Sequence, residues 1–207
     1  MSPLNLAFSD RELEAIRRHL QPFGRRALLR GGSIGLVATG LTACSGSTVA
    51  TPAGIKHLGS QYAIFDQLIK TFMPIPRGSR LVTADKVPVR ENIDTLYGGL
   101  PADIRHDLGQ GLTLLNYGAI LIGFHLKPFV SLEHSDAVAY CRSWQSGRSI
   151  QRSLMWVLKQ FVFLSYWREP VTWAAIEYDG PVSRRLGTPR QGNSPLPDPT
   201  ILVARKP

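Results

Sequence analysis

The chain has 207 residues, a length typical of one domain, and 24 Lys and Arg against 15 Asp and Glu give a formal net charge of +9. Its 8 Phe, 6 Tyr and 4 Trp are enough for one buried core. The basic residues are scattered until the tail, which argues against a nucleic-acid surface and favours an acidic protein face or anionic lipid headgroups.

Near the N-terminus, a pair of arginines precedes a short apolar run that ends in small residues. Arg25 and Arg26 are followed by Leu28 and Leu29, then by the run itself. This layout is typical of a secretory signal. The run is too short and too rich in glycine to span a bilayer, which takes ~20 mostly apolar residues. An amphipathic helix of the fold is the alternative, and four glycines at ~1 kcal/mol each argue against it. The arginine pair resembles the twin-arginine (Tat) export signal.

The apolar run ends in Leu41-Thr42-Ala43-Cys44, which resembles a lipobox. The resemblance implies that Cys44 receives diacylglycerol and becomes the new N-terminus, so that residues 1–43 are a Tat-type lipoprotein signal. The mature chain then has 207 − 43 = 164 residues, with 18 basic and 12 acidic side chains. Cys141 is its only free thiol, so no internal disulfide forms. Export also makes nucleic acid an unlikely partner.

After Cys44, residues 44–59 are small and polar, and we expect a flexible tether. Helical periodicity begins near Ser60 and stops at Pro74 and Pro76. A second apolar stripe starts at Val89 and is closed by Gly98-Gly99.

Pro101 can open a third helix, in which glycines at 109, 111, 118 and 123 mark either close packing or breaks. A fourth helix follows, with a capping serine at position 131 or 135. The segment 150–167 has the widest apolar face, and Pro170 ends it.

A short helix or turn follows Pro170, and residues 183–207 form an extended Pro- and Arg-rich arm without a core of its own. No run of alternating strand residues occurs. The predicted fold class is therefore all-α: a compact helical domain over 60–182, between the tether and the arm.

Motifs that carry chemistry are missing. The sequence has no dinucleotide-binding or phosphate-binding glycine loop, no haem-attachment motif and no H-x-x-x-H pair. Asp103 and Asp107 share a helix face, but they also suit the positive end of the helix dipole. Cys141 has the apolar neighbours of an inert core cysteine. We predict no catalytic, metal-binding or cofactor-binding residues in this chain.

Three segments in order resemble a known family. The first places Phe129, Leu132, Tyr140 and Trp144 around a short helix, the second is the long helix that ends in Tyr166-Trp167, and the third contains Trp173 and the run from Tyr178 to Pro181. This order is similar to that of the gluconate 2-dehydrogenase subunit 3 family, the small subunits of flavin-dependent membrane sugar and alcohol dehydrogenases. The resemblance covers residues 60–182, and "LIKTFMPIPRG" matches the family's first helix.

The resemblance implies that this chain is a non-catalytic subunit without a cofactor. Its large partner would be an FAD-containing flavoprotein of the glucose–methanol–choline type, which folds in the cytoplasm and is exported on the small subunit's Tat signal. A multihaem cytochrome c often accepts the electrons. This sequence departs from the family in two respects: the lipobox would anchor the complex to the membrane on the periplasmic side, and Trp167 stands where a second tyrosine is common.

Aromatic and basic residues near the C-terminal end of the domain predict the partner interface, because interface centres are rich in Trp, Tyr and Arg. These residues are Trp167, Trp173, Tyr178, Arg184 and Arg185. For Trp156, on the long helix, we expect a place in the core instead. Two other functions stay open: a free-standing exported lipoprotein that binds a ligand or envelope component, and an enzyme acting alone.

Overall fold

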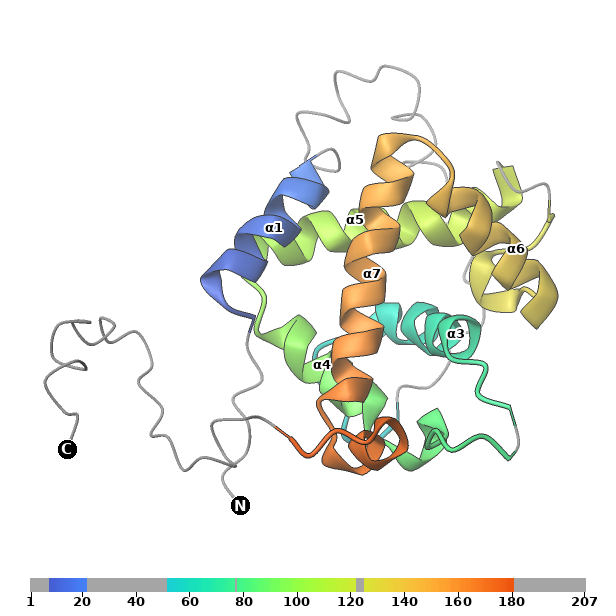
Figure 1. The fold of residues 1–207 in the computed structure, drawn as a ribbon. Helices are drawn as coiled ribbons and strands as arrows, with labels where there is room; N and C mark the ends of the chain where they lie inside the picture. Colours follow the sequence, from blue (N-terminus) through green and yellow to red (C-terminus); the bar gives the residue numbers. More distant parts are fainter. Residues whose placement is uncertain (1–7, 22–51, 77, 122–124, 181–207) are drawn as a thin grey trace, which may run out of the picture.

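The computed structural model describes residues 8–21, 52–76, 78–121 and 125–180, and no strand occurs within these ranges (Figure 1). The all-α class is therefore confirmed. The elements in chain order are α1 (Asp10–Leu20), η3 (Gly59–Gln61), α3 (Tyr62–Phe72), η4 (Ala84–Lys86), α4 (Val89–Gly98), α5 (Ala102–Leu121), η5 (Phe129–Ser131), α6 (His134–Gln145), α7 (Ser149–Trp167) and η6 (Pro170–Ile176).

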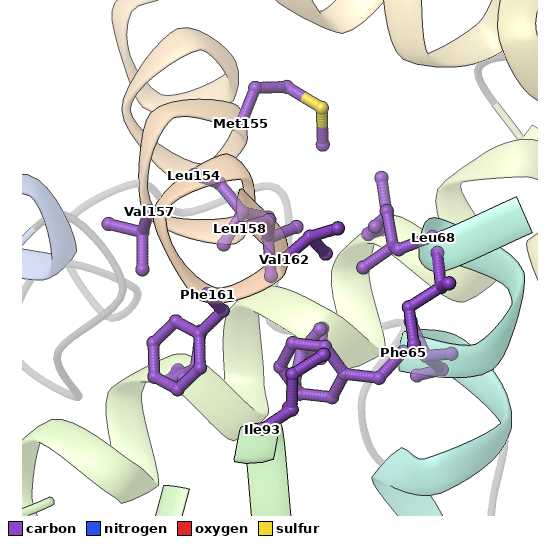
Figure 2. Close-up of a cluster of buried hydrophobic side chains, with 14 of the residues drawn as sticks. Phe65, Leu68, Ile93, Leu154, Met155, Val157, Leu158, Phe161 and Val162 are labelled. Atoms are coloured by element: carbon purple, nitrogen blue, oxygen red, sulfur yellow. The ribbon is translucent and has the colours of Figure 1, made fainter. Parts of the chain in front are cut away.

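Helix α7 is the centre of the domain, and α1, α3, α4 and α6 all pack against it (Figure 1). Its sequence explains this position, because apolar residues recur on most of its circumference. Phe161 and Val162 are fully buried, and Figure 2 shows Phe65 of α3 and Ile93 of α4 reaching toward them. Since one helix contacts four others, the core is a single cluster rather than separate layers.

Most predicted boundaries are confirmed. Helix α3 ends just before Pro74, α4 ends at Gly98, α5 starts directly after Pro101 and α7 ends before Pro170. Helix α5 runs without a break through its glycines at 109, 111 and 118. The predicted serine cap of α6 is wrong: Glu133 is the N-cap residue, and no side chain caps the helix by a hydrogen bond.

The ordered domain begins before the predicted boundary at residue 60. The carboxylate of Asp94 in α4 accepts hydrogen bonds from three successive backbone N–H groups, those of Lys56 (3.0 Å), His57 (2.7 Å) and Leu58 (2.8 Å). Leu58 is buried in the core. The end of the expected tether is therefore part of the fold, because one buried carboxylate holds its backbone.

Replacing Asp94 by Asn tests this anchor. Burial alone would raise the pKa of the Asp94 carboxyl, but the three N–H donors outweigh it, so the pKa lies below its ordinary value. Because the pKa of Asp94 is lower in the folded state, the ionised carboxylate stabilises the fold at pH values above the unfolded-state pKa of about 3.9. This contribution is lost as the pH falls through the folded-state pKa. We expect Asp94→Asn to lower the free energy of unfolding by about 1.5–3 kcal/mol at neutral pH. In urea titrations, the difference from wild type should shrink in acid, whereas the exposed-site control Asp136→Asn should stay close to wild type throughout.

Helix α1 packs against α5 and α7, although it lies inside the segment predicted to be a leader (Figure 1). Ile16 and Leu20 are each 1% exposed, and Phe8 is also buried. The folded core therefore extends into residues upstream of the arginine pair. None of the helices in the described ranges combines the length and apolar character that a bilayer crossing requires.

Candidate partner-binding surface

The C-terminal end of α7 is held by buried polar groups of other segments. Asn92 of α4 donates from Nδ2 to the carbonyl of Ser165 (2.9 Å) and to Oε1 of Glu169 (2.8 Å). The hydroxyl of Tyr166 donates to the carbonyl of Val82 (2.6 Å). Buried polar groups that are satisfied in this way fix one arrangement of the backbone. These hydrogen bonds therefore fix the position of the C-terminal end of α7, from which the next residues continue.

After α7 the chain turns back in η6, which Pro170 opens at its first turn. The indole Nε1–H of Trp173 donates to the carbonyl of Trp167 (2.6 Å), and the rings of Trp173 and Tyr178 meet edge to face at 5.2 Å. Gly180 lies directly behind Trp173 with φ +95°, and a Cβ there would approach the indole to 3.0 Å. A glycine is needed at this position on both grounds.

This turn exposes three apolar side chains, which we call the η6 patch: Val171 (54% exposed), Ile176 (51%) and Tyr178 (45%). Of the predicted interface residues, only Tyr178 belongs to it. Trp167 is half-buried against the core and meets Tyr166 at 4.9 Å, and Trp173 is half-buried beneath Tyr178.

Val171 and Ile176 are not among the residues predicted for the interface. Their signal was weak, because a short proline-led turn has no period that distinguishes an inward side chain from an outward one. Exposed apolar side chains close together in the chain, on a turn held by hydrogen bonds, make this turn a candidate for a protein–protein contact.

Trp156 does not fill the core, so that prediction is wrong. Its side chain is 38% exposed, and its ring stacks on His19 of α1 with centroids 4.3 Å apart. Trp156 stands two residues from both Leu154 and Leu158, which are buried, so it lies on the opposite face of α7. Apolar residues occur around most of the helix, and this misled the prediction. Leu164 was assigned to the apolar face and is 39% exposed.

Cys141, Asp103 and Asp107 are the other side chains that the sequence singled out. Cys141 is buried, and burial raises the pKa of its thiol to about 12, so it stays protonated as expected of a core cysteine. Asp103 is exposed and pairs with Arg17 of α1 at 3.2 Å. Burial raises the pKa of the nearby Asp107 carboxyl. Within the described ranges, no group of three His, Cys, Asp or Glu side chains could hold a metal ion.

An open cavity of about 420 Å³ lies along the outer face of α5. Polar side chains line most of it, among them Gln61, Tyr97, Arg105 and His106. Arg105 donates to the carbonyls of Gly98 (3.2 Å) and Leu100 (2.9 Å). Its Nε and the Oε1 of Gln61 are buried and have no hydrogen-bond partner among the described residues.

The predicted signal residues Arg25, Arg26 and Cys44 lie outside the described residues, as do Arg184 and Arg185 of the predicted interface. The chain matches no model of a known protein family, and no curated protein or solved structure is similar to it.

Proposed function

We propose that this chain is the non-catalytic small subunit of a membrane-associated, FAD-dependent dehydrogenase of the glucose–methanol–choline type. In this proposal, its twin-arginine signal exports the folded complex, and acylated Cys44 anchors it on the periplasmic side of the membrane. The flavoprotein subunit carries the FAD and the sugar or alcohol site. A multihaem cytochrome c is a further candidate partner.

The order of the aromatic motifs downstream of an export signal carries this proposal. In the structure, these motifs occupy the consecutive elements η5, α6, α7 and η6. Phe129 and Trp144 each lie against Tyr140, with centroids 6.0 and 5.7 Å apart, and the Tyr140 hydroxyl donates to the carbonyl of Leu115. The motif residues of η5 and α6 thus serve packing, whereas those after α7 border the η6 patch.

We assign the η6 patch as the contact with the flavoprotein. Its side chains are apolar and exposed, they lie on a turn next to the hydrogen bonds of Asn92, Tyr166 and Trp173, and the predicted arm follows them directly in the chain. A preorganised apolar surface binds with little loss of conformational entropy.

Purification of the native complex is the direct test. A tag at the C-terminus of this chain should recover a flavoprotein of the predicted type, with a yellow FAD spectrum and dehydrogenase activity toward a sugar or alcohol. Recovery of the chain as an unaccompanied monomer would contradict the proposal.

Charged substitutions in the η6 patch should weaken assembly. We expect Ile176→Asp with Tyr178→Asp to reduce affinity for the flavoprotein at least about ten-fold, or ~1.4 kcal/mol, because both would place a carboxylate in a desolvated contact. Titration of the flavoprotein onto immobilised small subunit measures this. Leu126→Asp, at an apolar side chain that is 87% exposed elsewhere, is the matched control. Equal binding by both variants would remove the η6 patch from the interface.

The mature N-terminus should be a diacylated Cys44. Mass spectrometry of protein extracted from membranes should show a chain that starts at Cys44 and carries the lipid mass. Cys44→Ser removes the thiol that would carry the acyl chains, and firm anchoring requires more than one such chain. The substitution should therefore release the subunit, and the flavoprotein with it, from the membrane fraction. An unmodified thiol at Cys44, or cleavage elsewhere, would contradict this.

The cavity on α5 favours the alternative, a free-standing lipoprotein that binds a polar ligand. Two buried polar atoms, one on Gln61 and one on Arg105, border it without partners among the described residues. The two functions predict different results for Arg105→Ala, which would abolish binding of such a ligand but leave recovery of the flavoprotein unchanged.

A further inference from the structure

Helix α1 covers an apolar surface that α5 and α7 form together. Phe8 meets Phe161 of α7 edge to face at 5.2 Å, and His19 stacks on Trp156 one and a half turns earlier on the same helix. Arg17 pairs with Asp103 of α5. The covered surface therefore includes two aromatic side chains of α7 and a carboxylate of α5, and we call it the α1 groove.

The sequence of α1 encodes a helix suited to this groove. Ser9 and Glu12 form a capping box, in which each side chain accepts the backbone N–H of the other residue. Leu13, Ile16 and Leu20 follow at helical spacing and share one face. The local sequence of residues 8–20 thus determines both the start of the helix and its apolar face.

These residues also lie ahead of the arginine pair, in the part of the chain that cleavage before Cys44 would remove. We propose that α1 is a leader-borne cover, and that its removal opens the groove of α5 and α7 to an amphipathic helix of the partner subunit. This inference rests on the proposed function, because it requires a cleaved leader and a partner.

The size of α1 is consistent with release after cleavage. While the chain is intact, docking is intramolecular, and covalent linkage can supply an effective concentration on the order of millimolar. Cleavage removes this advantage. The helix has 11 residues, whereas stable interfaces involve roughly 20–30 residues a side. A free peptide of this length is also marginally helical in water and must fold in order to bind.

The groove itself indicates the chemistry of the incoming partner. Apolar side chains at positions matching Ile16 and Leu20 would restore the packing, and a Lys or Arg matching Arg17 would pair again with Asp103. Asp107 lies one turn further along α5 and adds to the acidic character of that helix. The Asp103 carboxylate, which pairs with Arg17 of α1, favours a basic side chain at the matching position of an amphipathic helix over an anionic lipid surface.

A cut made in the full chain tests the cover. A protease site inserted directly before residue 44, in a Cys44→Ser background, allows cleavage of the purified protein in vitro. We expect fragment 1–43 to separate from the domain in gel filtration at micromolar concentration, while the domain keeps the circular dichroism of α3–α7. A labelled peptide of residues 8–21 should then bind the cut domain saturably and fail to bind the uncut chain. A fragment that remains bound at one to one, or a domain that unfolds once it leaves, would overturn the proposal by making α1 a permanent part of the fold.

A double variant that should open the groove without a cut, and a matched control, give a second test. Ile16→Gln with Leu20→Gln changes the buried face of α1, whereas Glu14→Gln with Arg18→Gln introduces the same side chain on its exposed face. The first pair should let the uncut chain bind the labelled peptide, and the second should not. If both double variants bound the labelled peptide equally, the proposal that α1 covers a binding groove would be overturned.

Hydrogen exchange of the native complex identifies the occupant. Protection of the α5 and α7 amides should return when the flavoprotein binds the processed subunit, whereas protection from a second copy of this chain would overturn the assignment to the partner. The in vitro cut does not depend on native processing. If α1 dissociates after the engineered cut but cells never cleave before Cys44, the proposed export function is contradicted. The inference that α1 covers a binding surface is then still supported.

Discussion

Replacing Arg25 and Arg26 by lysines should leave nearly all of this chain in the cytoplasm, together with the dehydrogenase activity of its partner. An arginine presents a planar fork of donors, which a lysine cannot reproduce although it keeps the charge. A receptor that reads the paired guanidiniums would therefore lose its recognition site. Fractionation of cells, followed by an activity assay and immunoblot of each compartment, measures the effect.

The chain has a second arginine pair that serves as a matched control. Arg17 and Arg18 are also adjacent, but they belong to α1, where Arg17 is paired with Asp103. The same lysine substitutions at this pair should leave export unchanged, because lysine preserves the charge next to Asp103. Normal periplasmic activity in the Arg25→Lys, Arg26→Lys variant would remove the idea that this chain carries its partner across the membrane.

Phe161→Ala should cost about 3–5 kcal/mol of unfolding free energy, as large aromatic truncations in cores do. Phe161 is fully buried at the centre of α7, and its ring lies 5.2 Å from that of Phe8 and 5.7 Å from that of Phe65. The substitution would leave a cavity where three helical segments meet. Since domains are stable by only about 5–15 kcal/mol, this loss would remove a substantial part of the total stability.

Urea titration of the full-length chain with Cys44→Ser measures this loss as a lower midpoint at an unchanged slope. Phe161→Leu is the control, because a volume-similar apolar side chain usually costs less than about 1.5 kcal/mol. A loss below about 1 kcal/mol for Phe161→Ala would mean that the site collapses or that Phe161 is not central to the core.

The sequence determined the helical class and most helix ends of this protein by itself. Pro74, Pro101 and Pro170 lack a backbone N–H, so each stops a helix or is suited to its first turn wherever the rest of the chain lies. The apolar period of α7 likewise predicted a deeply buried helix, and fully buried Phe161 bears this out. Local backbone chemistry and periodicity are sufficient for features of this kind.

The sequence of residues 8–20 also contains a helix signal. Ser9 and Glu12 form the capping box of α1, and Phe8 and Leu13 stand at the positions of a hydrophobic staple. The predicted leader covers residues 1–43, but residues 8–20 carry both the capping box and the apolar face of a helix that packs in the core.

Only the tertiary structure decided which side chains are exposed and what holds the chain ends. Val171 lies in a short turn that has no periodic signal, and the stacking of Trp156 on His19 depends on which helix packs beside α7. The Asp94 carboxylate binds a backbone segment 36 to 38 residues earlier in the chain, and no local pattern predicts that contact. Helix α1 shows the same limit: its amphipathic face was readable from the sequence, but its groove exists only after α5 and α7 have packed, since it consists of side chains from distant parts of the chain.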